Sequence, residues 1–391
     1  MLKRIIRTIL CKLVEFSLYR VKSFKKKDGK IKKLLIVRID NIGDFVIFSP
    51  MLKYYRMLYP NYHITLLVNR LALELAKRFD EMNALIAFDR RKFNRDLIYK
   101  RRLLKKIKEE EFDVVIYPTY SRESNGDYIV RFSEAAEKIG FDGDVCNITL
   151  KEKLENDKNY TKIIPAIPGI ILETERNKEF VEAFGAKVDN AIPSFTPSVD
   201  DETETKKLLF DNGLTDDKLF IVICPGVSSN NRMWPLEKYA QVVAWLRKEK
   251  NLEIVISGSN NERYLAEKIA VIANVSIIDI TGKTTLTALA AILKKSILCI
   301  GNDTGIIHLA AAVGTPTICI MGGGHFGRFF PYGNLSRNKI IFKKMDCFGC
   351  SWRCIYPNKI NMPVPCISHI HVADALREAE IVLNEIKKIR R

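Results

Sequence analysis

The stretch Gly301-Asn302-Asp303-Thr304-Gly305-Ile306-Ile307-His308-Leu309-Ala310-Ala311-Ala312 places a polar, glycine-flanked turn between two apolar segments. The apolar run 296–300 before the turn suits a buried parallel strand, and the small residues after it suit a helix packed closely on a sheet. The first N–H groups of such a helix lack backbone partners and lie at the positive end of its dipole, so they favour an anion. Asp303 or Thr304 could instead simply cap the helix.

The surrounding sequence extends this segment into a parallel α/β sheet. A second strand follows within 314–321, which completes a strand–helix–strand unit. Upstream, the strand 220–224 runs into the polar loop 225–235, and 252–257 and 277–280 read as further strands. Ligands of such sheets bind at the carboxyl ends of the strands. We therefore expect one binding site formed by these loops.

The N-terminal half repeats the pattern once. Residues 33–38 predict a strand, 39–44 a loop, and the residues from Phe45 to Tyr59 a helix that Pro60 ends. Further strands are predicted at 64–68 and 113–117. The connector 186–216 is less regular, so it is the natural hinge between two α/β halves.

Three motifs occur in order along these halves: Val37-Arg38-Ile39-Asp40-Asn41-Ile42-Gly43-Asp44, then Pro225-Gly226 with Arg232-Met233-Trp234-Pro235, then Gly301-Asn302-Asp303-Thr304-Gly305 with His308. Together they resemble family-9 glycosyltransferases, the ADP-heptose:lipopolysaccharide heptosyltransferase family, and the resemblance spans residues 32–383. It implies the α/β fold called GT-B, in which two Rossmann-like domains face a central cleft. The donor is then expected on the C-terminal domain and the acceptor on the N-terminal one.

The implied domain organisation has four parts. They are a basic amphipathic helix in 1–30, an N-terminal acceptor-binding domain in 31–195, a C-terminal nucleotide-sugar-binding domain in 196–369 with a cysteine-rich loop at 343–366, and a helix in 370–391 that packs back toward the N-terminal domain.

Transfer from a nucleotide-diphosphate sugar needs a base for the acceptor hydroxyl and positive potential for the leaving diphosphate. Asp44 matches the family's catalytic aspartate, although Asp44 or Asp40 could instead cap the following helix. Arg38, Asp40, Asn41 and Gly43 are the further residues expected on the acceptor side.

The phosphates are expected to meet the backbone N–H groups of Thr304 and Gly305, the Thr304 hydroxyl and the cation of Arg232. A solvated loop arginine is the alternative for Arg232, and an ordinary buried histidine is the alternative for His308. The other expected donor-side residues are Ser228, Ser229, Glu262, Thr284, Asp303 and His308. Because a helix start and an arginine can hold a diphosphate, we expect no cofactor to be required for catalysis.

Four of the nine cysteines have the spacing Cys347-x2-Cys350-x3-Cys354-x11-Cys366. Four thiols so spaced suit a structural zinc ion or, as an alternative, an iron–sulfur cluster. Disulfides or free thiols remain open, although disulfides seldom persist in the reducing compartment where nucleotide sugars are used. We expect this segment to lie away from the chemistry.

The formal charge of +17 is concentrated in two segments, 1–30 and 90–108. Residues 2–21 have apolar residues at helical spacing, with basic residues on the opposite face. No uninterrupted apolar run reaches the roughly 20 residues of a membrane span. The segment therefore predicts a helix lying on an anionic membrane surface. A helix packed on the protein is the alternative. The segment 90–108 is expected to meet phosphates or acidic sugars of a glycan, and no recognition module points to nucleic acid.

We therefore expect a cytoplasmic, inverting glycosyltransferase that is peripheral on the inner face of the cytoplasmic membrane. It would transfer a sugar, heptose from ADP-heptose in the first instance, to a lipopolysaccharide-type or other lipid-linked glycan acceptor. The alternatives are the same chemistry with another nucleotide sugar in capsule or O-antigen synthesis, and a catalytically silent sugar-nucleotide-binding module.

Overall fold

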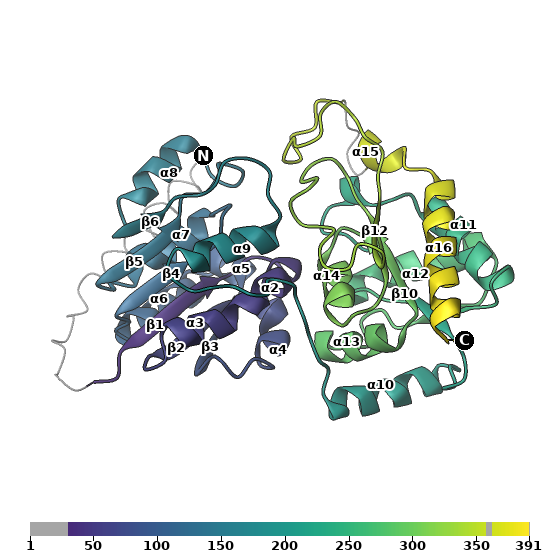
Figure 1. Ribbon diagram of the computed structural model, residues 1–391, viewed down its shortest axis with the longest axis horizontal. Helices are drawn as coiled ribbons and strands as arrows, with labels where there is room; N and C mark the ends of the chain where they lie inside the picture. The colour runs from purple at the N-terminus through teal and green to yellow at the C-terminus, as the bar shows by residue number, and fades with distance from the viewer. Residues whose placement is uncertain (1–29, 357–361, 391) are drawn as a thin grey trace. The chain divides into compact units, whose positions relative to one another are not determined.

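The computed structural model describes residues 30–356 and 362–390, which form two compact units (Figure 1). The N-terminal unit comprises the described part of Met1–Asn41 with Met51–Gly169 and Arg176–Asp189, and the C-terminal unit comprises Ile42–Pro50, Ile170–Glu175 and the chain from Asn190 onward. Two short segments of the N-terminal half thus belong to the C-terminal unit. The amphipathic helix predicted in 1–30 lies outside the described residues.

Each unit contains a six-stranded, fully parallel sheet. The N-terminal sheet has the order β3-β2-β1-β4-β5-β6 and consists of β1 (Lys33–Arg38), β2 (His63–Asn69), β3 (Ala84–Phe88), β4 (Val114–Tyr117), β5 (Glu137–Phe141) and β6 (Lys162–Ile164). The C-terminal sheet has the order β12-β11-β10-β7-β8-β9 and consists of β7 (Phe220–Cys224), β8 (Glu253–Ile256), β9 (Ile278–Asp279), β10 (Leu298–Asn302), β11 (Thr317–Ile320) and β12 (Asn338–Ile341).

Both orders are the doubly wound arrangement in which the sequence direction reverses beside the first strand of the sheet. The reversal falls between β1 and β4 in the N-terminal sheet and between β7 and β10 in the C-terminal sheet. Ligands bind at such switch points, outside the carboxyl ends of the strands. The motifs at 225–235 and 301–305 follow β7 and β10, so the structure places them together at the C-terminal switch point.

Helices flank each sheet, as Figure 1 shows. Those of the N-terminal unit are α3 (Leu52–Leu58), α4 (Leu73–Ala76), α5 (Arg90–Arg95), α6 (Leu97–Glu109), α7 (Ser124–Phe132), α8 (Leu150–Asp157) and most of α9 (Glu173–Glu182). Those of the C-terminal unit are α2 (Ile42–Phe48), α10 (Val199–Asp211), α11 (Leu236–Lys248), α12 (Arg263–Ala273), α13 (Leu286–Lys295), α14 (Gly305–Ala312), α15 (Pro365–Ser368) and α16 (Val372–Arg390).

The helix predicted from Phe45 to Tyr59 is wrong in two respects. It begins at Ile42, and a 3-10 turn at Ser49–Met51 divides it into α2 and α3. Pro50 explains the break, because its ring removes a backbone donor and clashes with the preceding turn. The Ser49 hydroxyl donates to the Val46 carbonyl at 2.8 Å. The division at Pro50 also marks the return of the chain to the N-terminal unit.

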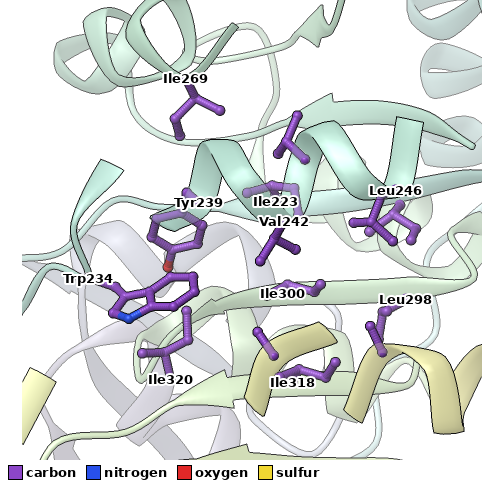
Figure 2. Close-up of a cluster of buried hydrophobic side chains, with 14 of the residues drawn as sticks. Ile223, Trp234, Tyr239, Val242, Leu246, Ile269, Leu298, Ile300, Ile318 and Ile320 are labelled. Carbon is purple, nitrogen blue, oxygen red and sulfur yellow. The ribbon is translucent and has the colours of Figure 1, made fainter. Parts of the chain in front are cut away.

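The core of the C-terminal unit is a cluster of aliphatic side chains from β7, β8, β10 and β11, with α11 and α16 packed against them. Figure 2 shows Trp234 and Tyr239 together at one end of this cluster and Leu246 and Leu298 at the other. The two aromatic rings meet edge to face, with centroids 5.1 Å apart. Trp234, a fully buried ring, therefore anchors the end of the loop 225–235 in the core.

Two predictions about the outer helices need correction. The final helix was expected to pack toward the N-terminal domain, but the apolar side of α16 is buried in the C-terminal core through Ala375, Ala379, Val382 and Leu383. The irregular connector predicted at 186–216 contains α10. Ser198 and Asp201 begin that helix as a reciprocal capping box, which is the sequence signal that was missed.

Candidate functional site

The start of α14 is the centre of the candidate site. Thr304 occupies the N-cap position, but its side chain makes no cap hydrogen bond, and its buried Oγ1 has no hydrogen-bond partner among the described residues. The N–H groups at the first turn of an α-helix also lack intrahelical partners. Simple capping was the alternative for Thr304, and the geometry does not support it. A ligand with acceptor oxygens would satisfy both the hydroxyl and the helix start.

Asn302 joins the two loops of the switch point. Its side-chain oxygen accepts hydrogen bonds from the Tyr239 hydroxyl at 2.8 Å and from the Trp234 backbone N–H at 3.3 Å, and its amide donates to the Arg232 carbonyl at 2.9 Å. Asn302 is buried, and its bonds to Tyr239 and Trp234 are shielded from water, whereas its bond to Arg232 is partly buried. The role of this residue was missed in the sequence analysis, although Asn302 stands inside the motif that was singled out.

Arg232 ends the short 3-10 turn Asn230–Arg232. Its guanidinium lies over the Trp352 ring at 4.2 Å, and its buried Nε has no hydrogen-bond partner among the described residues. Burial lowers the pKa of Arg232, while the negative charge of Asp303 opposes that shift. A half-buried cation with unused donors is suited to an anionic ligand. This environment differs from that of a solvated loop arginine, the alternative considered for Arg232.

Asp303 and His308 form a pair beside the start of α14. His308 Nε2 is 3.5 Å from Asp303 Oδ1, and His308 Nδ1 is 3.2 Å from the Tyr332 hydroxyl. The Tyr332 ring stacks on the imidazole, and burial raises the pKa of Tyr332. His308 is therefore buried with both ring nitrogens near protein groups.

The start of α2 packs against the start of α14 within the C-terminal unit. A Cβ on Gly305 would lie 2.9 Å from the Ile42 Cβ, and one on Gly43 would lie 2.7 Å from His308 Cδ2. Asp44 follows directly and is half-buried in the first turn of α2, where a loop was predicted. The two glycines thus allow the starts of α2 and α14 to approach closely. Asp44 is thereby placed on a turn adjoining the start of α14.

The other expected donor-side residues are arranged less tightly. The Glu262 carboxylate accepts hydrogen bonds from the Ser259 N–H and hydroxyl at 2.6 and 2.8 Å, and it lies against Gly226, where a Cβ would collide with it. Glu262 therefore lies between the ends of β7 and β8. Ser228 and Ser229 are exposed in the same loop. Thr284 is half-buried near the start of α13, and within residues 30–356 and 362–390 no hydrogen bond links it to the other candidates.

The acceptor-side candidates Arg38, Asp40 and Asn41 lie in the N-terminal unit, whereas Gly43 lies in the C-terminal unit. Arg38 is buried, with Nε 3.1 Å from Asp40 Oδ1. The loop after β1 is held by two side chains outside the motif: the Asn69 amide donates to the Asp40 carbonyl at 2.7 Å, and Arg90 donates to the Ile39 carbonyl at 3.0 Å.

Arg90 also pairs with Glu123, with Nη2 and Oε1 2.8 Å apart. The Glu123 carboxylate helps to raise the pKa of Arg90, whereas burial acts against that rise as the largest single effect. Arg90, the first residue of the basic segment 90–108, therefore stabilises the loop after β1.

The chain also contains Asp142-Gly143-Asp144, the Asp-x-Asp spacing that can hold a metal-bound diphosphate. It follows β5 in the N-terminal unit, and its carboxylates are used locally. Asp142 pairs with Lys153 at 2.5 Å, and Asp144 accepts from the Cys146 N–H at 3.0 Å. Both carboxylates of this motif therefore have partners within the N-terminal unit.

The four clustered cysteines line one small apolar cavity of about 10 Å³. Burial raises the pKa of Cys366, and the charges of the other three cysteines add to that rise. Among the described residues, no group of three or more His, Cys, Asp or Glu side chains has an arrangement that could hold a metal ion. The expectation that the segment is remote from the site is wrong, because Trp352 lies between Cys350 and Cys354 and contacts Arg232.

The sequence matches the profile of glycosyltransferase family 9 (heptosyltransferase) over residues 100–352. The chain belongs to this family. It is therefore a glycosyltransferase, and its two parallel six-stranded sheets confirm the predicted GT-B fold.

Known members of the family resemble the chain over most of its length. It is 22% identical to lipooligosaccharide heptosyltransferase 2 of Haemophilus influenzae over 74% of this chain and 83% of that protein. The structure of a family-9 glycosyltransferase from Veillonella parvula covers 92% of this chain and 99% of its own at 19% identity, with a TM-score of 0.70. Escherichia coli heptosyltransferase WaaC with ADP covers 90% and 99% at 16% identity, with a TM-score of 0.65.

Proposed function

We propose that this glycosyltransferase moves heptose from ADP-heptose to a lipopolysaccharide-type or other lipid-linked glycan acceptor, with inversion at the anomeric carbon. The observation that carries the proposal is the start of α14, where the buried Thr304 hydroxyl, which has no partner in the part of the chain that the structure describes, adjoins a helix N-terminus. The names of the relatives, which are lipooligosaccharide or lipopolysaccharide heptosyltransferases, support heptose as the sugar. The solved relative with ADP supports adenine as the base.

In this proposal the diphosphate of the donor binds at the α14 N-terminus. The backbone N–H groups of Thr304 and Gly305 and the Thr304 hydroxyl donate to phosphate oxygens, and the Arg232 guanidinium supplies the cation. Their combined positive potential stabilises the charge that develops on the leaving diphosphate. Ser228, Ser229, Glu262 and Thr284 contribute hydroxyl and carboxylate groups around the rest of the donor.

Asp44 is the proposed general base. Its carboxylate takes the proton of the acceptor hydroxyl as that oxygen attacks the anomeric carbon, and the bond from the anomeric carbon to the diphosphate oxygen breaks on the opposite side. The products are the glycosidic bond, ADP and protonated Asp44. The packing of α2 on α14 supports this assignment, because it brings Asp44 onto a turn adjoining the proposed phosphate site.

We propose that no cofactor is needed for transfer and that the four cysteines form a structural zinc site. Four thiols around one cavity suit the tetrahedral, sulfur-rich coordination of zinc. Cys347, Cys350, Cys354 and Cys366 would hold the ion after a small adjustment of the thiols. The metal would fasten the loop 343–366 without taking part in the reaction.

We propose that the enzyme works at the inner face of the cytoplasmic membrane as a peripheral protein. Within residues 30–356 and 362–390, no helix combines the length and hydropathy of a membrane span. The outer surface of α5 and α6 supports contact with anionic groups, because its cations are exposed and their apolar partners face the core. These exposed residues are Arg91, Lys92, Arg95, Arg101, Arg102, Lys105 and Lys106.

The experiment that tests the proposed function compares the wild type with Asp44→Asn. The wild type should release ADP and transfer heptose to a lipopolysaccharide acceptor when it is given ADP-heptose. Asp44→Asn should bind ADP with unchanged affinity and lose turnover by about 100-fold or more, since a general base contributes roughly that factor. Unchanged turnover would remove Asp44 from the mechanism, and transfer of another sugar in place of heptose would contradict the donor assignment.

A further inference from the structure

Trp352, on the cysteine-rich segment, lies in a backbone socket formed by Gly322 and Gly324. A Cβ on Gly322 would lie 2.7 Å from the indole, and one on Gly324 would overlap it. These glycines therefore let the indole lie directly on the main chain that follows β11. Since any side chain at either position would displace the ring, the position of the indole is built into the fold.

Backbone hydrogen bonds hold the same segment in register. Gly349 N–H donates to the Gly323 carbonyl at 2.8 Å, and Ser351 N–H donates to the Gly324 carbonyl at 2.9 Å. Gly323 N–H in turn contacts Cys366 Sγ at 3.4 Å. The loop between Cys347 and Cys354 is thus bonded to the segment 322–324 at two residues just before Trp352.

The guanidinium of Arg232 has little else to fix it. Among the described residues it makes no ion pair and no side-chain hydrogen bond, and its Nε is buried without a partner. The Asn302 amide fixes the backbone of Arg232 but cannot fix the long side chain. The Trp352 ring contacts the guanidinium at 4.2 Å, and a cation over an indole face is attracted by the ring. The negative charge of Asp303 also acts on Arg232, but no ion pair joins the two side chains among the described residues.

We propose that Trp352 is a positioning residue for donor binding, which holds the Arg232 guanidinium in the orientation that receives the diphosphate. This inference rests on the proposed function, because it assigns the ligand of Arg232. The indole covers the guanidinium at 4.2 Å and leaves N–H groups available for contact with phosphate oxygens. The cysteine-rich segment is thereby a structural part of the donor site.

The test is a double-mutant cycle with ADP as the probe, measured by calorimetry on the full chain. Arg232→Gln should weaken ADP binding by about 10- to 100-fold, the range for charge-assisted hydrogen bonds. Trp352→Ala should weaken it by about 3- to 30-fold in the wild-type background, the range for a cation–π contact. In the Arg232→Gln background the Trp352→Ala change should have less than a twofold effect, because the group it orients is gone.

Two controls separate positioning from general disruption. Trp352→Phe keeps an aromatic face in the socket and should restore most of the affinity. Trp245→Ala removes another indole in contact with a cation, since Lys250 lies 4.7 Å from its ring, and it should leave ADP affinity unchanged. Equal losses from Trp352→Ala in both backgrounds, or no loss in the wild-type background, would overturn the inference alone. A wild type that binds no ADP would overturn the proposed function and this inference together.

Discussion

Gly43 lies directly against the imidazole of His308, because a Cβ built on this glycine would come within 2.7 Å of His308 Cδ2. The same position is 3.3 Å from the Gly305 Cα, so the two helix starts meet main chain to main chain. Asp44 follows Gly43, and Thr304 precedes Gly305. One contact between glycines therefore brings the proposed base and the proposed phosphate site onto adjoining turns.

Gly43→Ala should disturb this contact. The added methyl group overpacks a filled interface, so the free energy of unfolding should fall by about 1 to 3 kcal/mol, and turnover should fall more than ADP affinity because Asp44 moves with α2. Denaturant unfolding, transfer assays and calorimetry measure the three effects. In Gly43→Ala/His308→Ala the ring that meets the methyl group is removed, so the combined loss of stability should be smaller than the sum of the single losses. Unchanged stability in Gly43→Ala would show that the helix starts are not packed as described.

Thr304→Val should separate binding from stability. Valine has nearly the same shape as threonine, and the buried hydroxyl that it removes has no partner among the described residues. The free energy of unfolding should therefore stay within about 0.5 kcal/mol of the wild type or rise. ADP should bind about 3- to 10-fold more weakly, since a hydrogen bond to phosphate is lost. A loss of stability with unchanged ADP affinity would make Thr304 a structural residue.

The parallel sheets and the loops at the carboxyl ends of β7 and β10 could be predicted from the sequence. Short apolar runs followed by glycine-rich polar turns are local signals, and both halves carry them. The roles of Asn302 and Trp352 could not be predicted in this way. Asn302 acts on Trp234 and Tyr239, and Trp352 acts on Arg232, across separations of 63 to 120 residues in the sequence. Such contacts depend on how the chain folds back and leave no local pattern.

The assignment of Ile42–Pro50 to the C-terminal unit also could not be predicted from local sequence patterns. The segment Ile42–Pro50 is bounded by a strand and a helix of the N-terminal unit, yet its own contacts are with α14. Gly43 of α2 meets Gly305 of α14, and the hydrophobic periodicity of α2 gives no sign of this contact. Pro50 could have predicted the break between α2 and α3, because proline rarely continues a helix.

Arg122 should matter for the stability of the N-terminal unit. Arg122 and Asp127 are both 1% exposed and 3.2 Å apart, and Asp127 also accepts from the Tyr160 hydroxyl at 2.5 Å. Arg122→Ala leaves the Asp127 carboxylate buried without its cation, which should lower the free energy of unfolding by about 3 to 5 kcal/mol at neutral pH. Arg131→Ala, an exposed arginine in the same helix as Asp127, should change it by less than about 0.5 kcal/mol.

The loss in Arg122→Ala should depend on pH. Burial raises the pKa of Asp127 above its ordinary value, and the Arg122 guanidinium opposes that rise. Without Arg122 the folded-state pKa rises further above that of the unfolded chain. The destabilisation should therefore be greatest above the folded-state pKa and should shrink as the pH falls through it and the carboxyl takes up a proton. A loss that is constant from pH 7 to pH 4 would contradict the buried ion pair.

The cysteine cluster predicts bound metal. Purified protein should contain about one zinc per chain by elemental analysis, and Cys350→Ser should lower that content and the melting temperature together. Cys146→Ser, outside the cluster, should change neither. Metal content near zero in wild-type protein prepared without chelators would contradict the zinc site.

The central claim is that the start of α14 with Arg232 binds the diphosphate of an ADP-linked sugar. Calorimetric titration of ADP, UDP and GDP into the wild-type protein, without added divalent metal, tests it most directly. The account predicts clear binding of ADP, weaker binding of UDP and GDP, and ADP binding about 10- to 100-fold weaker in Arg232→Gln. Stronger binding of UDP or GDP, or ADP binding that Arg232→Gln leaves unchanged, would contradict it.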